Sequence, residues 1–237
     1  TGKPLEVLTV ADPTPGPGEV VLAVKGCGIC GSDLHAARQP GGLPPGCIMG
    51  HEFAGEVVEV GPEAQGGLAP GDPVTAVPSI GCGHCAACVS GDVIHCPDVM
   101  ITGLGQLPGA YARYVRVGGN ESLRLPEGID FRQGALAEPL AVGLHAVNVA
   151  GLVPGQEVLV IGAGPIGLAV TLWARFFGAE SVLVSEPAEG RRAMAEQVGA
   201  TAVVDGAASA APILAMMSKD SAFNASGRLS VMVATPS

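Results

Sequence analysis

Four cysteines fall within fifteen residues of one another: Cys82, Cys85, Cys88 and Cys96. Thiolates at steps of three, three and eight residues can close a tetrahedron around one Zn²⁺ on a single loop. Because all four ligands come from the protein, no coordination position stays open, and the predicted zinc site is structural. His84 and His95 lie close by and could replace a thiolate, and a reduced loop without metal is the alternative interpretation.

A second group of chemically active residues is spread over three segments. Residues 30–35, Cys-Gly-Ser-Asp-Leu-His, offer a thiol, a hydroxyl, a carboxylate and an imidazole. His51 and Glu52 add an imidazole and a carboxylate, and Glu138 stands far along the chain. Each piece alone is a weak signal, since a lone histidine is commonly a core residue and a glutamate before proline can simply begin a helix. Together they offer the three ligands and one open position of a catalytic zinc.

A glycine-rich turn, G-x-G-x-x-G, follows the apolar run 158–161 and precedes a helical pattern. Such a turn favours a pyrophosphate at the helix N-terminus. Glu186 ends the next predicted strand, where a carboxylate accepts hydrogen bonds from a ribose diol and repels a 2′-phosphate, so we predict NAD rather than NADP. Arg191 and Arg192 argue for NADP instead, unless they only form a solvated face of the next helix. The predicted cofactor contacts are Gly162, Gly164, Pro165, Ile166, Gly167, Glu186 and Arg191.

The predicted secondary structure that positions these residues changes along the chain, from short strands to alternating strands and helices. Short apolar runs bounded by glycine and proline predict strands at 19–25, 55–61, 74–77 and 110–117, which is typical of a small barrel or sandwich. Residues 135–149 have helical spacing. Strands at 158–161, 181–185 and 201–205 then alternate with helices at 165–177 and 189–198, which predicts a parallel sheet. We therefore divide the chain into domains 1–150 and 151–237. The pattern fades after Asp205.

Composition excludes several classes of protein. The chain has 237 residues, of which 48% are hydrophobic and 14% charged, so a packed core is expected rather than disorder. A net charge of −10 argues against a nucleic-acid partner. The N-terminus carries no secretory signal pattern, and the apolar run 158–174 is too short and too interrupted by glycine and proline to span a membrane. We expect a cytoplasmic protein without a membrane partner, in which clustered cysteines bind metal rather than form disulfides.

Three motifs, in order, resemble the zinc-containing medium-chain alcohol dehydrogenases. They are the segment 50–61, Gly-His-Glu-Phe-Ala-Gly-Glu-Val-Val-Glu-Val-Gly, the cysteine loop that follows it, and the glycine-rich turn. Segments 30–35 and 138–145 are most similar to the polyol, threonine and butanediol dehydrogenases of that family. The resemblance covers about residues 4–205. It implies an α/β fold with a β-rich part: a GroES-like catalytic β-barrel domain followed by an incomplete Rossmann doubly wound parallel sheet.

The resemblance also implies roles for residues. Cys30 and His51 match two catalytic zinc ligands, and Glu138 stands where many relatives have a cysteine. We expect Glu52 to be the third ligand, with Glu138 either a ligand or a neighbour of one. Asp33 resembles the carboxylate that orients a ligating histidine. Ser32 and His35 resemble a proton relay, so Ser32, His35 and Glu138 are the predicted catalytic residues.

The implied function is a zinc-dependent oxidoreductase that transfers a hydride between a secondary alcohol or polyol and NAD, with two zinc ions per chain. Two alternatives stay open: a non-catalytic zinc-binding fragment with a degenerate nucleotide domain, and an NADP-dependent quinone-type reductase of the same superfamily. The segment from Gly151 supplies only one half of a dinucleotide fold. We therefore expect these 237 residues to be a fragment, inactive alone, of a homo-oligomeric enzyme.

Overall fold

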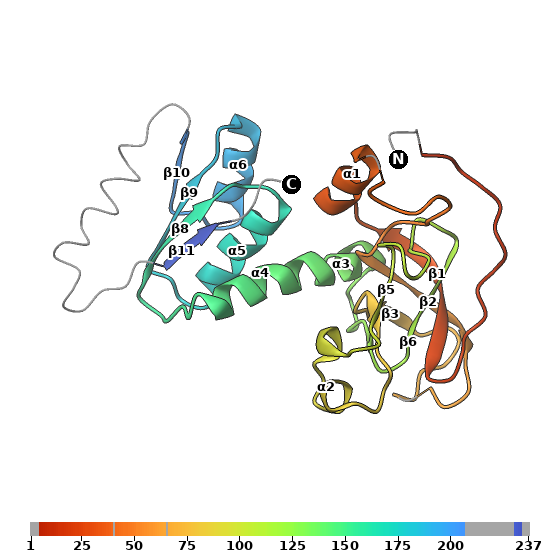
Figure 1. Ribbon diagram of the computed structural model, residues 1–237. Helices are drawn as coiled ribbons and strands as arrows, with labels where there is room; N and C mark the ends of the chain where they lie inside the picture. The colour runs from red at the N-terminus through yellow and green to blue at the C-terminus, as the bar shows by residue number, and fades with distance from the viewer. Residues whose placement is uncertain (1–4, 40, 65, 207–229, 234–237) are drawn as a thin grey trace. The chain divides into compact units, whose positions relative to one another are not determined.

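The computed structural model describes residues 5–39, 41–64, 66–206 and 230–233. The chain divides into two compact units, Thr1–Glu138 and Pro139–Ser237 (Figure 1). The division falls at the start of helix α4 (Ala137–Val149), whereas the sequence predicted a boundary at the end of that helix. Among the described residues, no helix is both long enough and apolar enough to cross a lipid bilayer.

The first unit is built on a five-stranded antiparallel sheet with strand order β6-β1-β2-β3-β7. Its strands are β1 (Glu19–Cys27), β2 (Phe53–Val60), β3 (Pro73–Ala76), β6 (Tyr114–Gly118) and β7 (Ser122–Arg124). Val20, Leu22, Val57 and Val74 are all fully buried and belong to the core cluster of this unit. The strands predicted at 19–25, 55–61 and 74–77 are confirmed to within two residues at each end.

The strand predicted at 110–117 is wrong in its first half, because β6 begins only at Tyr114. The backbone N–H groups of residues 109–111 donate instead to the carbonyls of residues 48–50, over distances of 2.7, 2.9 and 2.8 Å. These bonds to a distant segment replace the pairing that an extension of β6 would need. As a result, Tyr111 lies along the segment that leads into His51.

The remaining elements of this unit are short. They are α1 (Gly31–Arg38), β4 (Ser79–Ile80), α2 (Ala86–Val89), η1 (Val93–His95), β5 (Met100–Ile101) and α3 (Phe131–Ala135). Helix α1 begins where Asp33 accepts the backbone N–H of Cys30 at 3.0 Å, which satisfies a donor that the helix itself leaves free. Helix α3 begins with a reciprocal pair of bonds, of 2.8 and 3.0 Å, between Asp130 and Gln133.

The second unit is a parallel sheet with strand order β10-β9-β8-β11. Its strands are β8 (Glu157–Ile161), β9 (Ser181–Ser185), β10 (Ala202–Val204) and β11 (Ser230–Val233). The predicted alternation of strands with helices is confirmed by α5 (Pro165–Phe176) and α6 (Glu189–Gln197). Strand β11 lies where the sequence showed no clear pattern, and the apolar stretch 213–217 is outside the described residues.

This strand order places a reversal between β8 and β11. The chain moves outward from β8 to β9 and β10 through α5 and α6, and then returns to the other side of β8. In open parallel sheets, ligands bind beyond the carboxyl ends of the strands at such a reversal. The glycine-rich turn follows β8 directly, so it lies at this point of the sheet.

Close packing fixes the elements that carry this turn. Val158, Leu159 and Val160 of β8 are successive residues and all almost completely buried, as expected for a sheet covered on both faces. Helix α4 approaches α5 closely, since a Cβ on Gly143 would lie 2.6 Å from the Cβ of Ala169. The indole N–H of Trp173 donates to the carbonyl of Leu140 at 2.8 Å and ties the same two helices together.

Candidate metal centres and dinucleotide loop

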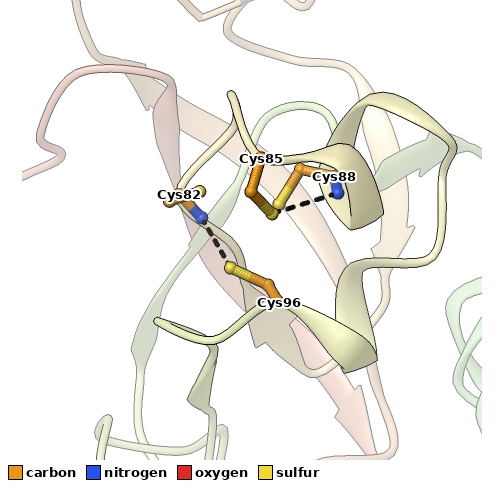
Figure 2. Close-up of side chains that lie close together, drawn as sticks. All are labelled: Cys82, Cys85, Cys88 and Cys96. Atoms are coloured by element: carbon orange, nitrogen blue, oxygen red, sulfur yellow. Dashed lines mark hydrogen bonds between the residues drawn. The ribbon is translucent and has the colours of Figure 1, made fainter.

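The sulfur atoms of the four predicted ligands in the cysteine loop gather at one place (Figure 2). The Sγ atoms of Cys82, Cys85, Cys88 and Cys96 all lie within 4.8 Å of one another. Zn–S bonds of about 2.3 Å set the sulfurs of a tetrahedral site roughly 3.8 Å apart. The four thiols therefore fit a zinc ion with only a small contraction.

Backbone donors favour a thiolate at Cys82, whereas at Cys88 a backbone hydrogen bond is outweighed by burial and the neighbouring thiols, which raise the pKa of Cys88 to about 12. The N–H of Cys88 faces the sulfur of Cys85 at 3.5 Å, and the N–H of Cys82 faces that of Cys96 at 3.4 Å (Figure 2). Backbone hydrogen bonds from His84 and Cys85 lower the pKa of the Cys82 thiol to about 6. The charged form of sulfur, which is the form that ligates metal, is thus favoured at this position.

The two histidines of the loop have other partners. The Nδ1 of His84 lies 2.8 Å from the carbonyl of Cys82, and the Nδ1 of His95 lies 2.8 Å from the Asp92 carboxylate. Neither belongs to the metal-ligand groups found in the described part of the chain. The set with four sulfurs is therefore the one that the geometry supports.

The second predicted ligand set is also brought together. One ligand atom each from Cys30, His51 and Glu52 lie within 4.8 Å of one another. The cause is the antiparallel pairing of β1 with β2, in which Cys27 stands opposite Phe53. The residues just after β1 consequently meet those just before β2, and the N–H of Gly28 donates to the carbonyl of Glu52 at 2.6 Å.

Asp33 sets the orientation of His51. The Oδ1 of Asp33 lies 3.5 Å from the Nδ1 of His51, and both side chains are almost completely buried. Neither atom has a hydrogen-bond partner within the described residues. With a proton on Nδ1, a small closure of this gap would pair the two atoms and leave the Nε2 lone pair for a metal ion. The donor set of thiol, imidazole and carboxylate, with this support, fits zinc.

The two glutamates differ in their distance from this group. Burial raises the pKa of Glu52, although His51 and a hydrogen bond from Cys30 act in the opposite direction. Burial also raises the pKa of Glu138, His51 lowers it, and the charges of Glu52 and Asp33 raise it further. Glu138 is therefore an electrostatic neighbour of the site, but it lies outside the group of three ligand atoms.

Ser32 and His35 are placed by helix α1. The hydroxyl of Ser32 lies 3.5 Å from the Nε2 of His51, on the side where a ligand would bind. His35 is exposed one turn further along the same helix, and residues three apart lie on one face. The two side chains thus lie on the same face of α1, and both are exposed.

Tyr111 is a site residue that the sequence analysis missed. Its hydroxyl lies 2.8 Å from the Oδ2 of Asp33 and 3.0 Å from the carbonyl of Gly28. Nothing in the local sequence signals this role, because Tyr111 is 78 residues from Asp33. The sequence shows only that Tyr111 lies in the segment 110–117, which was expected to be a strand.

The glycine-rich turn has the predicted local form. Gly162 has a φ of +96°, which non-glycine residues rarely adopt, and Gly164 is the N-cap of helix α5. Pro165, Ile166 and Gly167 form the first turn of that helix. Pro165 has no N–H, and the backbone N–H groups of Ile166 and Gly167 have no partner within the helix. Such a turn suits a phosphate group.

Glu186 is held by the same turn. Its carboxylate accepts the N–H of Ala163 at 2.8 Å and that of Ala188 at 2.9 Å, and the side chain is buried. Burial alone raises the pKa of Glu186, but these two donors and the charges of Arg191 and Arg192 outweigh it, so the pKa is lowered. Arg192 donates to the carbonyls of Glu186 and Pro187, whereas Arg191 is exposed.

Comparisons with known proteins agree with this arrangement. Residues 16–127 match the family model of the alcohol dehydrogenase GroES-like domain. L-threonine 3-dehydrogenase of Pyrococcus horikoshii is 40% identical over 204 residues, which are 84% of this chain and 58% of that protein. The structure of galactitol-1-phosphate dehydrogenase from Escherichia coli is 30% identical with a TM-score of 0.81, and the match covers 94% of this chain and 63% of that one.

A third relative was solved with a bound dinucleotide. A zinc-binding dehydrogenase structure from Sinorhizobium meliloti, solved with NADP, is 40% identical with a TM-score of 0.75 and covers 84% of this chain and 58% of that one. The chain spans 53–60% of the length of the first curated relatives that it matches.

Proposed function

Because the chain belongs to the zinc-containing medium-chain alcohol dehydrogenase family, we propose that it carries the zinc site and part of the dinucleotide site of a hydride-transferring enzyme. The substrate is a secondary alcohol or polyol, and the hydride acceptor is NAD. The observation that carries this proposal is the group of Cys30, His51 and Glu52, whose ligand atoms lie within 4.8 Å of one another beside Asp33. Three protein ligands leave one of four tetrahedral positions for the substrate oxygen.

The residues of this site would divide the chemistry between them. Cys30, His51 and Glu52 would hold the zinc, which when bound acts as a Lewis acid and lowers the pKa of an alcohol hydroxyl. Ser32 would accept the proton of the substrate hydroxyl while giving up its own toward His35, since its hydroxyl lies 3.5 Å from the ligating face of His51. His35 would pass that proton to solvent from the exposed side of α1. Glu138 would contribute negative charge near His51 without ligating.

The cysteine loop would hold a second zinc ion with a structural role. Its four sulfurs leave no position for a substrate. Helix α2 and η1 are too short to be stable in isolation, with four and three residues. A metal ion that joins them to the rest of the loop supplies the missing stabilisation.

Glu186 favours NAD over NADP in this proposal. Its carboxylate is fixed at the end of β9 by two backbone donors and still has lone pairs for a ribose diol. A 2′-phosphate would meet this buried negative charge. Arg191 is the residue that would pair with such a phosphate, and it is exposed. Replacement Glu186→Ala is therefore expected to narrow the preference for NAD over NADP. Glu189→Ala, at the first residue of α6, is the matched control.

Zinc content and dinucleotide binding test the proposal directly on this chain. We expect two zinc ions per chain by elemental analysis, and tighter binding of NAD than of NADP by calorimetry. Cys30→Ser should remove one ion and leave dinucleotide binding in place. One zinc or none in the wild-type chain, or stronger binding of NADP, would contradict the proposal.

A further inference from the structure

We propose that Tyr111 is a positioning residue for the catalytic metal: its hydroxyl holds the Asp33 carboxylate, and through that carboxylate His51, in the geometry that binds zinc. The inference rests on the proposed function, because it concerns the same site. Tyr111 lies outside the segments that supply the metal ligands, and its hydroxyl connects those segments.

The hydroxyl of Tyr111 has two acceptors within hydrogen-bond distance. The Oδ2 of Asp33 lies at 2.8 Å and the carbonyl oxygen of Gly28 at 3.0 Å. A phenol has a single proton, and a bond to an ionised carboxylate is stronger than one to an amide carbonyl. The principal partner of Tyr111 is consequently Asp33.

Asp33 uses its two oxygens for two different ligand residues. Oδ2 accepts the backbone N–H of Cys30 at 3.0 Å as well as the Tyr111 hydroxyl. Oδ1 faces the Nδ1 of His51 at 3.5 Å. A carboxylate is rigid and planar, so fixing Oδ2 also fixes the direction of Oδ1 and hence the imidazole ring.

The third ligand residue is connected through Gly28. The N–H of Gly28 donates to the backbone carbonyl of Glu52 at 2.6 Å, and the carbonyl of Gly28 faces the Tyr111 hydroxyl. A side chain at Gly28 would displace the Glu52 carboxylate, because a Cβ there would clash with an oxygen of that group. The hydroxyl therefore lies at a point that joins the segments of Cys30, His51 and Glu52.

The ring of Tyr111 is itself held firmly. The N–H of Tyr111 donates to the carbonyl of Met49 at 2.8 Å, and its ring packs against Gly50, the residue before His51. A Cβ on Gly50 would lie 2.7 Å from Cδ1 of the ring, and the φ of +99° also excludes other residues. Burial and the charge of Asp33 raise the pKa of Tyr111, so the phenol stays protonated and donates.

The test compares the isosteric variant Tyr111→Phe with Tyr114→Phe. These are the two tyrosines of the chain, and the hydroxyl of Tyr114 makes no hydrogen bond within the described residues. Each zinc-loaded protein is dialysed against buffers of graded free zinc, and the retained zinc is measured. Exchange with Co²⁺ then distinguishes the sites, because four thiolates and a mixed sulfur, nitrogen and oxygen set give different visible spectra.

For Tyr111→Phe we expect a 10- to 100-fold weaker zinc affinity at the mixed site only, as is typical when the support of a metal ligand is removed. The cysteine site should keep its affinity, and Tyr114→Phe should match the wild type at both sites. Equal affinity of Tyr111→Phe and wild type, or an equal loss at both sites, would overturn the positioning role. A wild-type chain with zinc in the cysteine site alone would instead overturn the proposed function, and the inference with it.

A double-variant cycle tests whether Tyr111 acts through Asp33. If it does, Asp33→Asn combined with Tyr111→Phe should bind zinc within about twofold of Asp33→Asn alone. Additive losses would refute the connection. Should Tyr111→Phe fail to fold, wild-type protein labelled with 3-fluorotyrosine gives two ¹⁹F signals. The Tyr111 signal should shift as zinc fills the mixed site while that of Tyr114 does not, and an unmoved Tyr111 signal would overturn the proposal.

Discussion

Replacement Glu186→Gln tests the reasoning about the dinucleotide turn without any ligand. The carboxylate accepts two backbone N–H groups, from Ala163 at 2.8 Å and from Ala188 at 2.9 Å, in a buried position. Glutamine has the same shape but carries an amide –NH₂ in place of one oxygen. One of the two backbone donors then faces another donor and loses its acceptor.

The magnitude follows from these two bonds. A hydrogen bond to a charged group contributes about 1.5–3 kcal/mol, and a buried donor left without a partner costs about 1–3 kcal/mol. Since these terms overlap, we expect Glu186→Gln to lower the free energy of unfolding of the second unit by about 2–4 kcal/mol at pH 7. Glu189→Gln, an exposed change in the first turn of α6, should cost less than about 1 kcal/mol.

The effect has a defined pH dependence. The pKa of Glu186 is lower in the folded chain than its ordinary value of about 4.3. Stabilisation by the carboxylate is therefore fully present above that ordinary value and is lost as the pH falls through the lowered one. The difference between wild type and Glu186→Gln should be constant from pH 7 to about pH 5 and should shrink below about pH 4.

Urea unfolding followed by tryptophan fluorescence measures this difference. The single tryptophan, Trp173, lies on α5 and reports the second unit. A Glu186→Gln midpoint equal to that of Glu189→Gln would refute the assigned hydrogen bonds. A difference that grows on acidification would refute the assigned charge state.

Three further predictions concern the metal loops and the close packing. Cys85→Ser should lose one zinc ion and unfold at a lower temperature, whereas Cys30→Ser should lose the other ion with little change in thermal midpoint; zinc analysis and calorimetry measure both. Gly50→Ala should destabilise the chain by about 2–4 kcal/mol, because φ is +99° and the new Cβ meets an aromatic ring; an unchanged thermal midpoint would contradict this. Gly143→Ala should lower the stability measured by tryptophan fluorescence by about 1–2 kcal/mol, since the clash with α5 outweighs the better helix propensity of alanine.

Much of the fold was predictable because its signals are local. The change from short strands to an alternation of strands and helices after residue 157 follows from hydrophobic spacing and from glycine and proline positions. The expected fold class, a GroES-like unit followed by a parallel sheet of the Rossmann type, is confirmed. Strand β11 was not predicted, because its place beside β8 depends on pairing with residues some seventy positions earlier in the chain.

The two metal sites separate what the sequence determines from what the tertiary structure decides. The cysteine loop could be predicted with its ligands, because four thiols within fifteen residues can meet only around one point. The mixed site depends on the register of β1 against β2, which brings Cys30 to His51 and Glu52, and leaves Glu138 outside the group of ligand atoms. Tyr111 reaches Asp33 only because residues 109–111 bond to residues 48–50 instead of extending β6. Short spacings constrain side chains through covalent geometry alone, whereas contacts between distant segments exist only once the sheet has formed and its register is set.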